Sequence, residues 1–543
     1  MRINFFFIVF VIIVGTSSVF AQNTVGTTLN TASSYDAYTL FTLKNTTYLI
    51  NNCGQVINTW SSDFTPGFSV YLLPDGNLLR AEFNNNSGPF IPGKGGRVAI
   101  SDWNSNIIWH YDFSSSLTTQ HHDICPLPNG NILVLLVEVK TESQALFAGR
   151  DPNNLAEGSL FSEKIIEVRP VGENGVEVVW EWNIWDHLIQ DFDDTKTNYG
   201  DVLHNPQLLD INYLGFSEGK ENWLHVNSIQ YNEDLDQIVI STRQLNEIYI
   251  IDHATSKQEA ASHTGGERGK GGDFLYRWGN PLAYKAGTVE DQKLYGQHFP
   301  NWIAKGFSDE GKIMIFNNGF GRDTEFSSVE IIDPPQTNPG DYIINSGEKI
   351  GPVNFDWTYI DPDDPLNFFS KIMSSAQRLP NGNTLICEGT EGHFFEIDKN
   401  KNIVWNYVVP ISPDGILSQG DTPDPSRFFR AYKYAPENPA FDGKNMSPGN
   451  PIEHNFNINE CLSLDVEEVE VSEFHIYPNP VKESLHIISA LQIHQLELYN
   501  VQGIKIKKVL NQSTLYVSDL ASGMYILRVY SENKISSKKI IIE

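Results

Sequence analysis

The sequence is poor in cysteine and in positive charge. Its 543 residues include four cysteines, Cys53, Cys125, Cys387 and Cys461, and their wide spacing excludes a zinc ribbon or a CxxC redox motif. Lysine and arginine together number 38 against 67 aspartates and glutamates, so the formal net charge is −29. This charge argues against nucleic acid or an anionic membrane surface as a partner. In so acidic a chain, a local cluster of positive groups is a candidate binding site for an anionic substrate.

Long hydrophobic runs are missing except at the start of the chain. Residues 5–14 are apolar, follow Met1-Arg2, and precede small residues at Val19-Phe20-Ala21. This pattern predicts a signal peptide over residues 1–21, with an uncleaved anchor as the alternative. The run is too short for a membrane span, so we expect a protein secreted or held at the cell surface, with no stable membrane span. An oxidising compartment allows a disulfide, but the spacing assigns no pair. Cys53, Cys125 and Cys387 are predicted to be small buried residues.

Two short patterns recur along the chain. A Leu-Pro-Asp/Asn-Gly-Asn turn followed by a strand occurs at residues 73–79, 127–133 and 379–385, with looser copies at 232–240 and 308–315. Asn-Gly and Asp-Gly favour tight turns because these residues tolerate positive φ. A strand that ends in tryptophan recurs at Trp60, Trp109, Trp180, Trp278 and Trp405, with a weaker copy at Trp357. About six copies of a four-strand unit predict an all-β fold, a six-bladed β-propeller over residues 22–434. A seven- or eight-bladed ring, or a pair of β-sandwiches, is the alternative.

The repeats stop near Tyr434, and the composition changes. Residues 435–472 are first rich in Pro, Asn and Gly and then acidic, which predicts a linker. Residues 473–543 contain short alternating segments such as Ser484–Ile488 and Gln495–Tyr499. These predict a small C-terminal β-sandwich domain.

This C-terminal segment resembles the type A sorting domain of the type IX secretion system. The matching features are Tyr477-Pro-Asn-Pro480, Leu520–Ile526 and the basic pair Lys538-Lys539. The resemblance implies that the type IX machinery is a partner. It also implies export through the periplasm and outer membrane and removal of the domain, with release or anchoring at the surface. Histidines within it are therefore excluded from any catalytic site.

Three histidines and one arginine are the strongest candidates for a functional site. His225, His298, Arg322 and His393 lie on four segments that each belong to a repeated unit. A closed ring of repeats is expected to bring them to one central axis. Imidazoles and a guanidinium that converge there would bind an oxyanion, which points to sulfate or phosphate chemistry.

Further candidates flank these segments. His121-His122-Asp123 precedes a repeat strand. Adjacent strand residues point to opposite faces, which disfavours joint metal ligation, so we expect His122 alone to line the channel and no metal to bind. Arg243 is a candidate second anion ligand, or an ion-pair partner. Trp302 is expected to stack on an aryl ring, or else to pack between blades.

Roughly residues 45–434 resemble the bacterial arylsulfate sulfotransferases that need no nucleotide sulfate donor. The resemblance rests on His225–Ile229, Ile238–Arg243, Gly272–Pro281, Gln297-His298 and Phe316–Gly319. It implies a six-bladed propeller that moves a sulfuryl group from a phenolic sulfate ester to a phenol through a sulfated histidine, without a cofactor. By position, His393 matches the nucleophile, and His225, His298 and Arg322 match the residues that bind and polarise the sulfuryl group. A neutral imidazole is a good nucleophile near pH 7.

The chain departs from that family at its start. About twenty residues separate Gln22 from the first repeat, too few for the N-terminal sandwich domain that helps the periplasmic enzymes to dimerise, so we expect a monomer. Two other functions compete with sulfotransfer. The first is a hydrolase that uses the same oxyanion site, but the sequence does not contain the Cys/Ser-x-Pro-x-Arg motif of sulfatases. A non-catalytic surface propeller that binds an anionic glycan or a protein is compatible with the fold alone.

Overall fold

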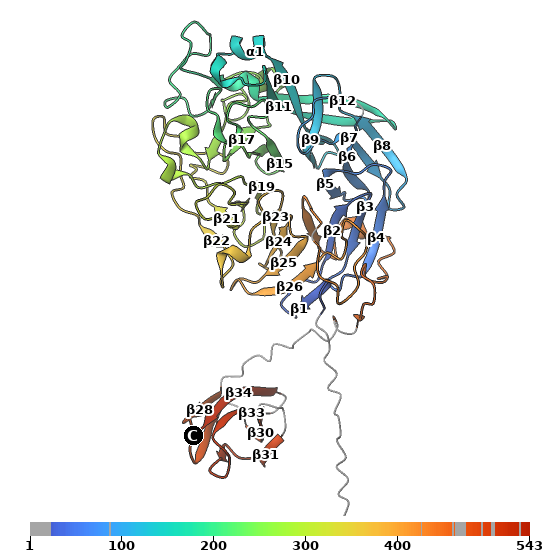
Figure 1. Cartoon of the computed structure of the whole chain (residues 1–543), viewed down its shortest axis with the longest axis vertical. Helices are drawn as coiled ribbons and strands as arrows, with labels where there is room; N and C mark the ends of the chain where they lie inside the picture. Colours follow the sequence, from blue (N-terminus) through green and yellow to red (C-terminus); the bar gives the residue numbers. More distant parts are fainter. Residues whose placement is uncertain are drawn as a thin grey trace, which may run out of the picture. The chain divides into compact units, whose positions relative to one another are not determined.

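The computed structural model describes residues 23–85, 88–424, 426–458, 461, 474–489, 492–500, 505–531 and 534–543. The chain divides into two units, with the boundary between Leu464 and Asp465 (Figure 1). The expected signal peptide, residues 1–21, and the acidic run of residues 465–473 lie outside the described residues. No helix in the described parts of the chain is long and apolar enough to cross a membrane.

Five antiparallel sheets of the first unit are built mainly from consecutive strands. The first contains β5 (Pro66–Leu72), β6 (Leu78–Phe83), β7 (Gly96–Ser101) and β8 (Ile107–Asp112), and the second β9 (Thr118–Pro126), β10 (Ile132–Thr141), β11 (Ser159–Val171) and β12 (Gly175–Asn183). The third contains β15 (Val226–Asn232), β16 (Gln237–Thr242), β17 (Glu247–Asp252) and β18 (Tyr276–Trp278), and the fourth β19 (His298–Trp302), β20 (Ile313–Asn317), β21 (Ser328–Ile332) and β22 (Trp357–Tyr359). The fifth contains β23 (Ser375–Arg378), β24 (Thr384–Glu388), β25 (His393–Ile397) and β26 (Ile403–Val408).

The sixth sheet joins the two ends of the unit. Its strands β2 (Tyr38–Leu43), β3 (Thr46–Ile50) and β4 (Val56–Ser61) are completed by β27 (Ala431–Tyr434), in the order β27-β2-β3-β4. In the same way, β1 (Gly26–Asn30) adds a fifth strand to the β23–β26 sheet by pairing with β26. Each of these two sheets therefore contains strands from both ends of the unit.

The first strands of successive sheets pack side by side in a closed series. β5 lies against β9, β9 against β15, β15 against β19, and β19 against β23; β23 contacts β27, and β2 contacts β5. Figure 1 shows the sheets following one another around the unit in chain order. The prediction of an all-β propeller is confirmed, and the described residues of the unit form six sheets of four or five strands.

The recurring patterns have a clear structural role. The Leu-Pro-Asp/Asn-Gly-Asn turns connect the first and second strands of three sheets, and their glycines Gly76, Gly130 and Gly382 have φ of 82°, 83° and 88°. Five of the recurring tryptophans are buried on the last strand of a sheet. The indole N–H of Trp60 donates to Asp102 O, and that of Trp109 to Gly175 O, each in the next sheet. The tryptophans thus bury their rings between sheets while their one polar atom stays bonded.

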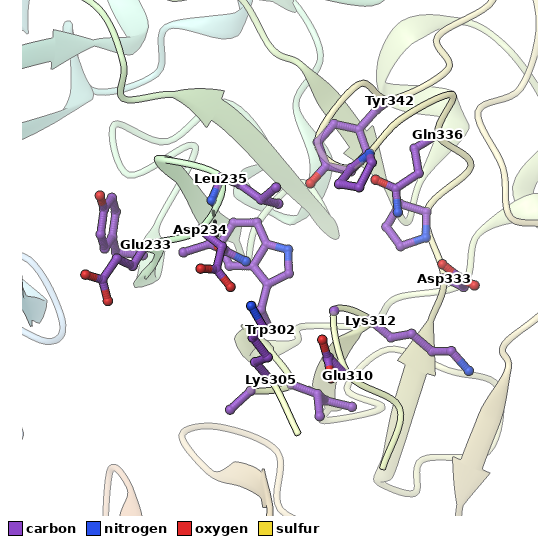
Figure 2. A pocket seen from close by; sticks show the side chains of 17 residues that line it. Glu233, Asp234, Leu235, Trp302, Lys305, Glu310, Lys312, Asp333, Gln336 and Tyr342 are labelled. Atoms are coloured by element: carbon purple, nitrogen blue, oxygen red, sulfur yellow. Dashed lines mark hydrogen bonds between the residues drawn. The ribbon is translucent and has the colours of Figure 1, made fainter. Parts of the chain in front are cut away.

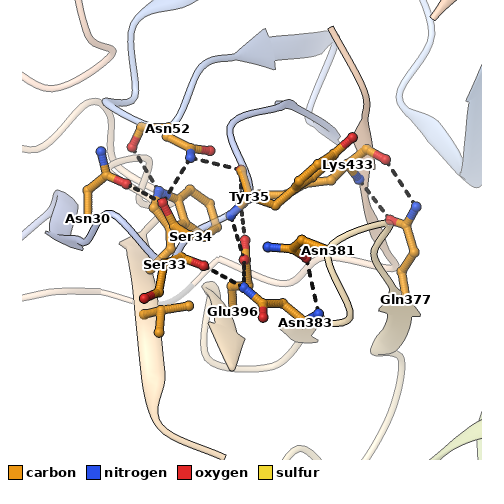
Figure 3. A network of polar contacts seen from close by, with 12 residues as sticks. Asn30, Ser33, Ser34, Tyr35, Asn52, Gln377, Asn381, Asn383, Glu396 and Lys433 are labelled. Carbon is orange, nitrogen blue, oxygen red and sulfur yellow. Dashed lines mark hydrogen bonds and ion pairs between the residues drawn. The ribbon is translucent and has the colours of Figure 1, made fainter. Parts of the chain in front are cut away.

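A buried polar network lies where the ends of the unit meet (Figure 3). Oε2 of Glu396 lies 2.6 Å from Nζ of Lys433, and its Oε1 accepts from the backbone N–H of Tyr35 at 2.7 Å and from Nδ2 of Asn383 at 2.6 Å. Both charged side chains are fully buried. A buried ion pair with its remaining sites bonded holds its neighbours in one arrangement. Here it fixes β27 and the β1–β2 connection to the β23–β26 sheet.

The segment after β27 packs on the propeller, although its composition predicts a linker. The 3₁₀ turn η7 (Pro439–Phe441) places the ring centroid of Phe441 5.0 Å from that of Tyr38. Gln55 and Pro451 form an isolated antiparallel β-bridge. Cys461 forms a disulfide with Cys53. The expectation that Cys53 is a buried thiol is therefore wrong, while Cys125 and Cys387 are buried free thiols as expected.

The remaining elements of the first unit are short. They are α1 (Glu142–Phe147), α2 (Lys257–Ala260), the parallel pair β13 (Leu188–Ile189) and β14 (Leu209–Asp210), and the 3₁₀ turns η1 (Pro152–Asn154), η2 (Ile184–His187), η3 (Gly215–Ser217), η4 (Pro281–Tyr284), η5 (Val289–Asp291) and η6 (Pro365–Asn367).

The second unit consists of two small sheets around a common core. One contains β28 (Phe474–Tyr477), β29 (Ser484–Ser489) and β32 (Thr514–Tyr516); the other has the order β31 (Lys505–Leu510), β30 (Ile493–Asn500), β33 (Gly523–Ser531) and β34 (Lys534–Ile542). Leu485 of the first sheet and Leu496 of the second are fully buried in the same cluster. The small C-terminal β-sandwich is confirmed.

Candidate active site

Three histidines lie at or near the starts of the first strands of three successive sheets. His122 is in β9, His225 directly precedes β15, and His298 begins β19. His122 and His225 have φ of 49° and 50°, and Phe299, after His298, has φ of 51°. The pairing register shifts at each of these places. Such bulges re-aim side chains out of the regular alternation of a strand.

The three imidazoles form one buried cluster. The ring centroids of His122 and His225 are 4.7 Å apart. Burial is the largest influence that holds the pKa of each of the two well below its ordinary value, and a proton on His298 would lower both pKa values further. Burial and Arg243 lower the pKa of His298 to about 3. All three rings are therefore neutral near pH 7.

The hydrogen bonds of His298 fix its tautomer. Its Nδ1 lies 2.7 Å from Oδ1 of Asn318 and 3.1 Å from the carbonyl of Gly296, which are both acceptors. Nδ2 of Asn318 donates to the carbonyls of Ser370 and Met373, so the amide orientation is determined. Nδ1 of His298 therefore carries the proton, and Nε2 presents a lone pair. That lone pair accepts a weak bond from the backbone N–H of Met373 at 3.2 Å.

His122 is held by a chain of buried side chains. Its Nδ1 lies 2.9 Å from Nδ1 of His121, whose Nε2 lies 2.7 Å from Oε2 of Glu163. Because the carboxylate accepts, His121 carries its proton on Nε2, and Nδ1 of His122 donates to it. Nε2 of His122 is then unprotonated. We expected adjacent histidines to face opposite ways, but the left-handed φ of His122 brings the two rings into contact.

Gly93 and Glu163 both contribute to the positions of the histidines in the cluster. A Cβ on Gly93 would come within 2.1 Å of the His122 ring, so only glycine lets the two segments approach. The second oxygen of Glu163 accepts from the backbone N–H of Val226 at 3.1 Å. Glu163 therefore positions His122 through His121 and also the backbone next to His225. Nδ1 of His225 lies 2.8 Å from Nδ2 of Asn222; with the amide in this orientation, His225 carries its proton on Nε2.

Arg243 supplies a positive charge beside the histidines. It follows β16, and its backbone N–H donates to the carbonyl of His225 at 3.2 Å. Its guanidinium lies over the ring of Phe320 at 5.2 Å, and its buried Nε makes no hydrogen bond. No carboxylate pairs with it among the described residues. A half-buried guanidinium without a carboxylate partner, beside neutral imidazoles, is a site for an anion.

Arg430, which is buried, is a second cation that the sequence did not indicate. Unlike Arg243, it is paired with Asp123 through bonds of 2.9 and 2.6 Å. Its guanidinium lies over Phe299 and Phe429, at 4.2 and 4.5 Å. Because Asp123 neutralises it, Arg430 serves as a support beneath the cluster rather than as a free anion ligand.

Two other predicted residues form hydrogen bonds outside the cluster. Arg322 donates to the carbonyl of Phe326 and to Oγ of Ser328, within the β20–β21 connection. His393 begins β25, the third strand of its sheet, where Glu388 and Asn406 bond its two nitrogens at 3.0 and 2.5 Å. Among the described residues, neither Arg322 nor His393 makes a hydrogen bond or ring contact with His225 or His298, so their convergence at one axis stays a prediction. Arg322 lies between the second and third strands of its sheet, as Arg243 does, and its guanidinium lies over the ring of Tyr295 at 5.4 Å.

Trp302 also lies apart from the histidines. It ends β19, the strand that His298 begins, and it lines a cavity of about 580 Å³ with Tyr231 and Tyr342. Figure 2 shows Trp302 within this cavity, with charged side chains such as Glu310 and Lys312 around it. A role for Trp302 in stacking on a substrate at the histidine cluster is not supported by this position.

Comparisons with known proteins agree with these observations. A family model described as Arylsulfotransferase (ASST) matches residues 79–412, and one described as Secretion system C-terminal sorting domain matches residues 475–543. The arylsulfate sulfotransferase AssT of Escherichia coli O6:H1 is 29% identical over 191 residues, which cover 34% of this chain and 30% of that protein. The chain thus matches less than a third of the relative's length.

Solved structures show only distant likeness. A protein of unknown function from Bacteroides caccae has a TM-score of 0.38 at 12% identity, covering 73% of this chain and 98% of its own. The periplasmic gluconolactonase PpgL of Pseudomonas aeruginosa has a TM-score of 0.34 at 10% identity, covering 71% and 95%. These values carry no argument about function. Because the family match covers most of the propeller, the chain belongs to the arylsulfotransferase (ASST) family and ends in a secretion-system sorting domain.

Proposed function

We propose that this protein is a sulfotransferase that moves a sulfuryl group from a phenolic sulfate ester to a phenol at the cluster of His122, His225, His298 and Arg243. Family membership supports the reaction class. One observation carries the site: an unprotonated imidazole nitrogen, Nε2 of His298, shares a buried cluster with a guanidinium that has no carboxylate partner among the described residues.

In the first step, Nε2 of His298 attacks sulfur, and the bond from sulfur to the phenolic oxygen breaks. The phenol leaves as phenolate, and the sulfuryl group stays on Nε2. Transfer of a sulfuryl group keeps negative charge on its peripheral oxygens, as in phosphoryl transfer, so fixed hydrogen-bond donors stabilise the transition state. Arg243 and Nε2–H of His225 are those donors. The proton on Nδ1 of His298 is held by Asn318, which stabilises the positive charge that develops on the ring.

In the second step, the acceptor phenol attacks the sulfur and releases His298. Nε2 of His122 accepts the phenolic proton. The resulting imidazolium donates to His121, which in turn donates to Glu163. The hydrogen-bond chain to Glu163 stabilises the positive charge on the buried ring of His122. The proton then passes to the first phenolate or to water, so the two steps balance overall.

This proposal assigns the nucleophile to His298 rather than to His393. Both nitrogens of His393 face acceptor oxygens, on Glu388 and Asn406. Nε2 of His298 instead receives only the N–H of Met373, in a weak bond of 3.2 Å that a substrate can displace. Arg243 likewise replaces Arg322 as the main anion ligand, since the guanidinium of Arg322 is bonded within its own sheet.

The test uses a chromogenic aryl sulfate with and without an added phenol. We expect phenol-dependent release of the chromophore, lost in His298→Ala and retained in His393→Ala. Mass spectrometry of the protein without acceptor should find one sulfuryl group on His298. Release that ignores the phenol would favour a hydrolase, and no release from several aryl sulfates would favour a non-catalytic binding propeller.

We also propose that the sorting domain directs the protein through the type IX secretion system to the cell surface or the medium. The match over residues 475–543 supports this destination. Comparing the location of the full chain with that of a variant lacking residues 475–543 tests it, because the truncated chain should stay in the periplasm.

A further inference from the structure

A second cluster of ionisable side chains lies outside the proposed active site. His187 ends η2, after β12; His263 lies in the segment after α2; and Asp273 precedes β18. The cluster therefore joins connections that belong to two neighbouring sheets. Nδ1 of His187, Nδ1 of His263 and a carboxylate oxygen of Asp273 all lie within 4.8 Å of one another.

Both histidines point a ring nitrogen at the same oxygen. Nδ1 of His187 lies 2.8 Å from Oδ1 of Asp273, and Nδ1 of His263 lies 2.7 Å from it. His187 and Asp273 are buried, while the side chain of His263 is 57% exposed. The cluster thus has a buried floor and one side open to solvent.

The bonds of His187 create a valence problem. Its Nε2 lies 2.9 Å from the carbonyl of Ala260, which only accepts, so Nε2 carries a proton. A neutral imidazole has a single N–H, so Nδ1 and the carboxylate oxygen would then face each other with lone pairs. Either a second proton or a metal ion must lie between them. An imidazole whose far N–H donates to a backbone carbonyl is the usual arrangement of a metal-bound histidine.

We propose that His187, His263 and Asp273 bind a zinc ion, with water at the fourth position. Two imidazole nitrogens and one carboxylate oxygen are a common zinc ligand set. Zinc with ligands at 2.0–2.2 Å has tetrahedral ligand edges of about 3.3 Å, so the donor atoms must separate by about half an ångström. The exposed His263 can move away from Asp273, and the carboxylate of Asp273 must turn away from the buried His187 by a similar amount.

The zinc ion would link the segment after β12 to the segment before β18, which belong to two neighbouring sheets. Trp182 of β12 stacks on His187, with ring centroids 5.7 Å apart, and its indole N–H donates to Gly272 O at 2.8 Å. The same two segments are thus already in contact beside the cluster. A metal bound there resists their separation and stabilises the folded chain, because the ligands are not held together in the unfolded state.

The experiment is calorimetric titration of the metal-stripped full chain with Zn²⁺, together with thermal unfolding. We expect one tight equivalent per chain and a higher unfolding temperature. His263→Ala should weaken that equivalent by about 100-fold or more, since loss of a ligand exceeds the usual cost of losing an outer-shell partner. His263 is exposed, so this variant should fold; Asp273→Asn is the second variant. His204→Ala is the matched control, because His204 forms an exposed pair with Asp201 at 2.7 Å.

Two results would overturn the proposal. The first is wild-type affinity no tighter than that of His263→Ala, which would mean that His187 is a buried imidazolium. The second is a tight equivalent that survives in His263→Ala and disappears in His122→Ala, which would assign the ion to the histidines of the proposed active site.

Discussion

Nε2 of His121 lies 2.7 Å from Oε2 of Glu163, and neither side chain reaches solvent. A buried carboxylate in this position fixes the tautomer of His121 and, through it, that of His122. It also favours a positive charge on His122 when a proton arrives. The proposed base therefore depends on a residue that touches neither substrate nor sulfur.

Glu163→Gln tests this positioning role. The amide can still accept from His121 but carries no charge, so we expect kcat to fall by about 10–100-fold with little change in KM for the donor. The acidic limb of the kcat/KM profile should also move, because His122 loses the charge that supports its protonation. A variant that folds less well but keeps the wild-type pH profile would show that Glu163 is only structural.

Arg243→Gln should separate the two candidate arginines. Loss of a fixed donor to a transition-state oxyanion typically lowers kcat by about 10²–10³-fold, and we expect a loss of this size for Arg243. Arg322→Gln is the control, because its guanidinium bonds Phe326 and Ser328 instead; its kcat/KM should stay within a few-fold of wild type. The reverse result would assign the anion site to Arg322. Both are measured by steady-state kinetics with an aryl sulfate.

Acid should destabilise the propeller through its buried neutral histidines. His298 has a pKa lowered to about 3 by burial and Arg243, against about 6.5 for an unfolded histidine. Between these values the unfolded chain binds more protons, so the free energy of unfolding falls as pH falls from 6.5 towards 3 and is fully retained above 6.5. From pH 7 to pH 5, His298 alone should account for about 2 kcal/mol.

The measurement for that prediction is denaturant unfolding at pH 7 and pH 5. His298→Gln cannot titrate there, so it should lose about 2 kcal/mol less than wild type over the same interval. Equal losses in the two proteins would contradict the depressed pKa.

The Cys53–Cys461 disulfide should stabilise the first unit. The two cysteines are separated by 408 residues, and cross-links of this kind typically contribute about 2–4 kcal/mol. Cys461→Ser should lower the unfolding temperature but leave kcat unchanged at 25 °C, because the bond is remote from the histidines. Cys53→Ser/Cys461→Ser should match the single variant, and a reductant should then have no effect. A lower kcat in either variant would contradict this.

Much of the fold could be predicted because its signals are local. The Leu-Pro-Asn-Gly-Asn turns and the tryptophan strands each lie within a few residues of sequence, and they form turns and strands as predicted. The disulfide could not be predicted, since the position of Cys461 depends on how residues 435–458 pack on the first sheet, which no local pattern reports.

The positions of the candidate residues in their sheets could be predicted only in part. His122 lies in the strand that precedes a Leu-Pro-Asn-Gly-Asn turn, and such a turn follows the first strand of a sheet. His393 comes after such a turn and after one more strand, which puts it on the third strand. Alternation along a strand shows which face a side chain takes but not which strand borders the axis. Glu163, Asn318 and Arg430 act through partners in distant segments, so their roles become visible only in three dimensions.

The shared sheet of β2, β3, β4 and β27 has a consequence for the timing of folding. The first of these strands, β2, lacks its inner neighbour until residues 431–434 have left the ribosome, and the outer edge of β26 is unpaired until β1 adds to it. Pairings between such distant segments form late and slowly. The propeller therefore cannot close before residues 431–434 have been made. Until then the edge of β2 that pairs with β27 has no partner, and the ring stays open.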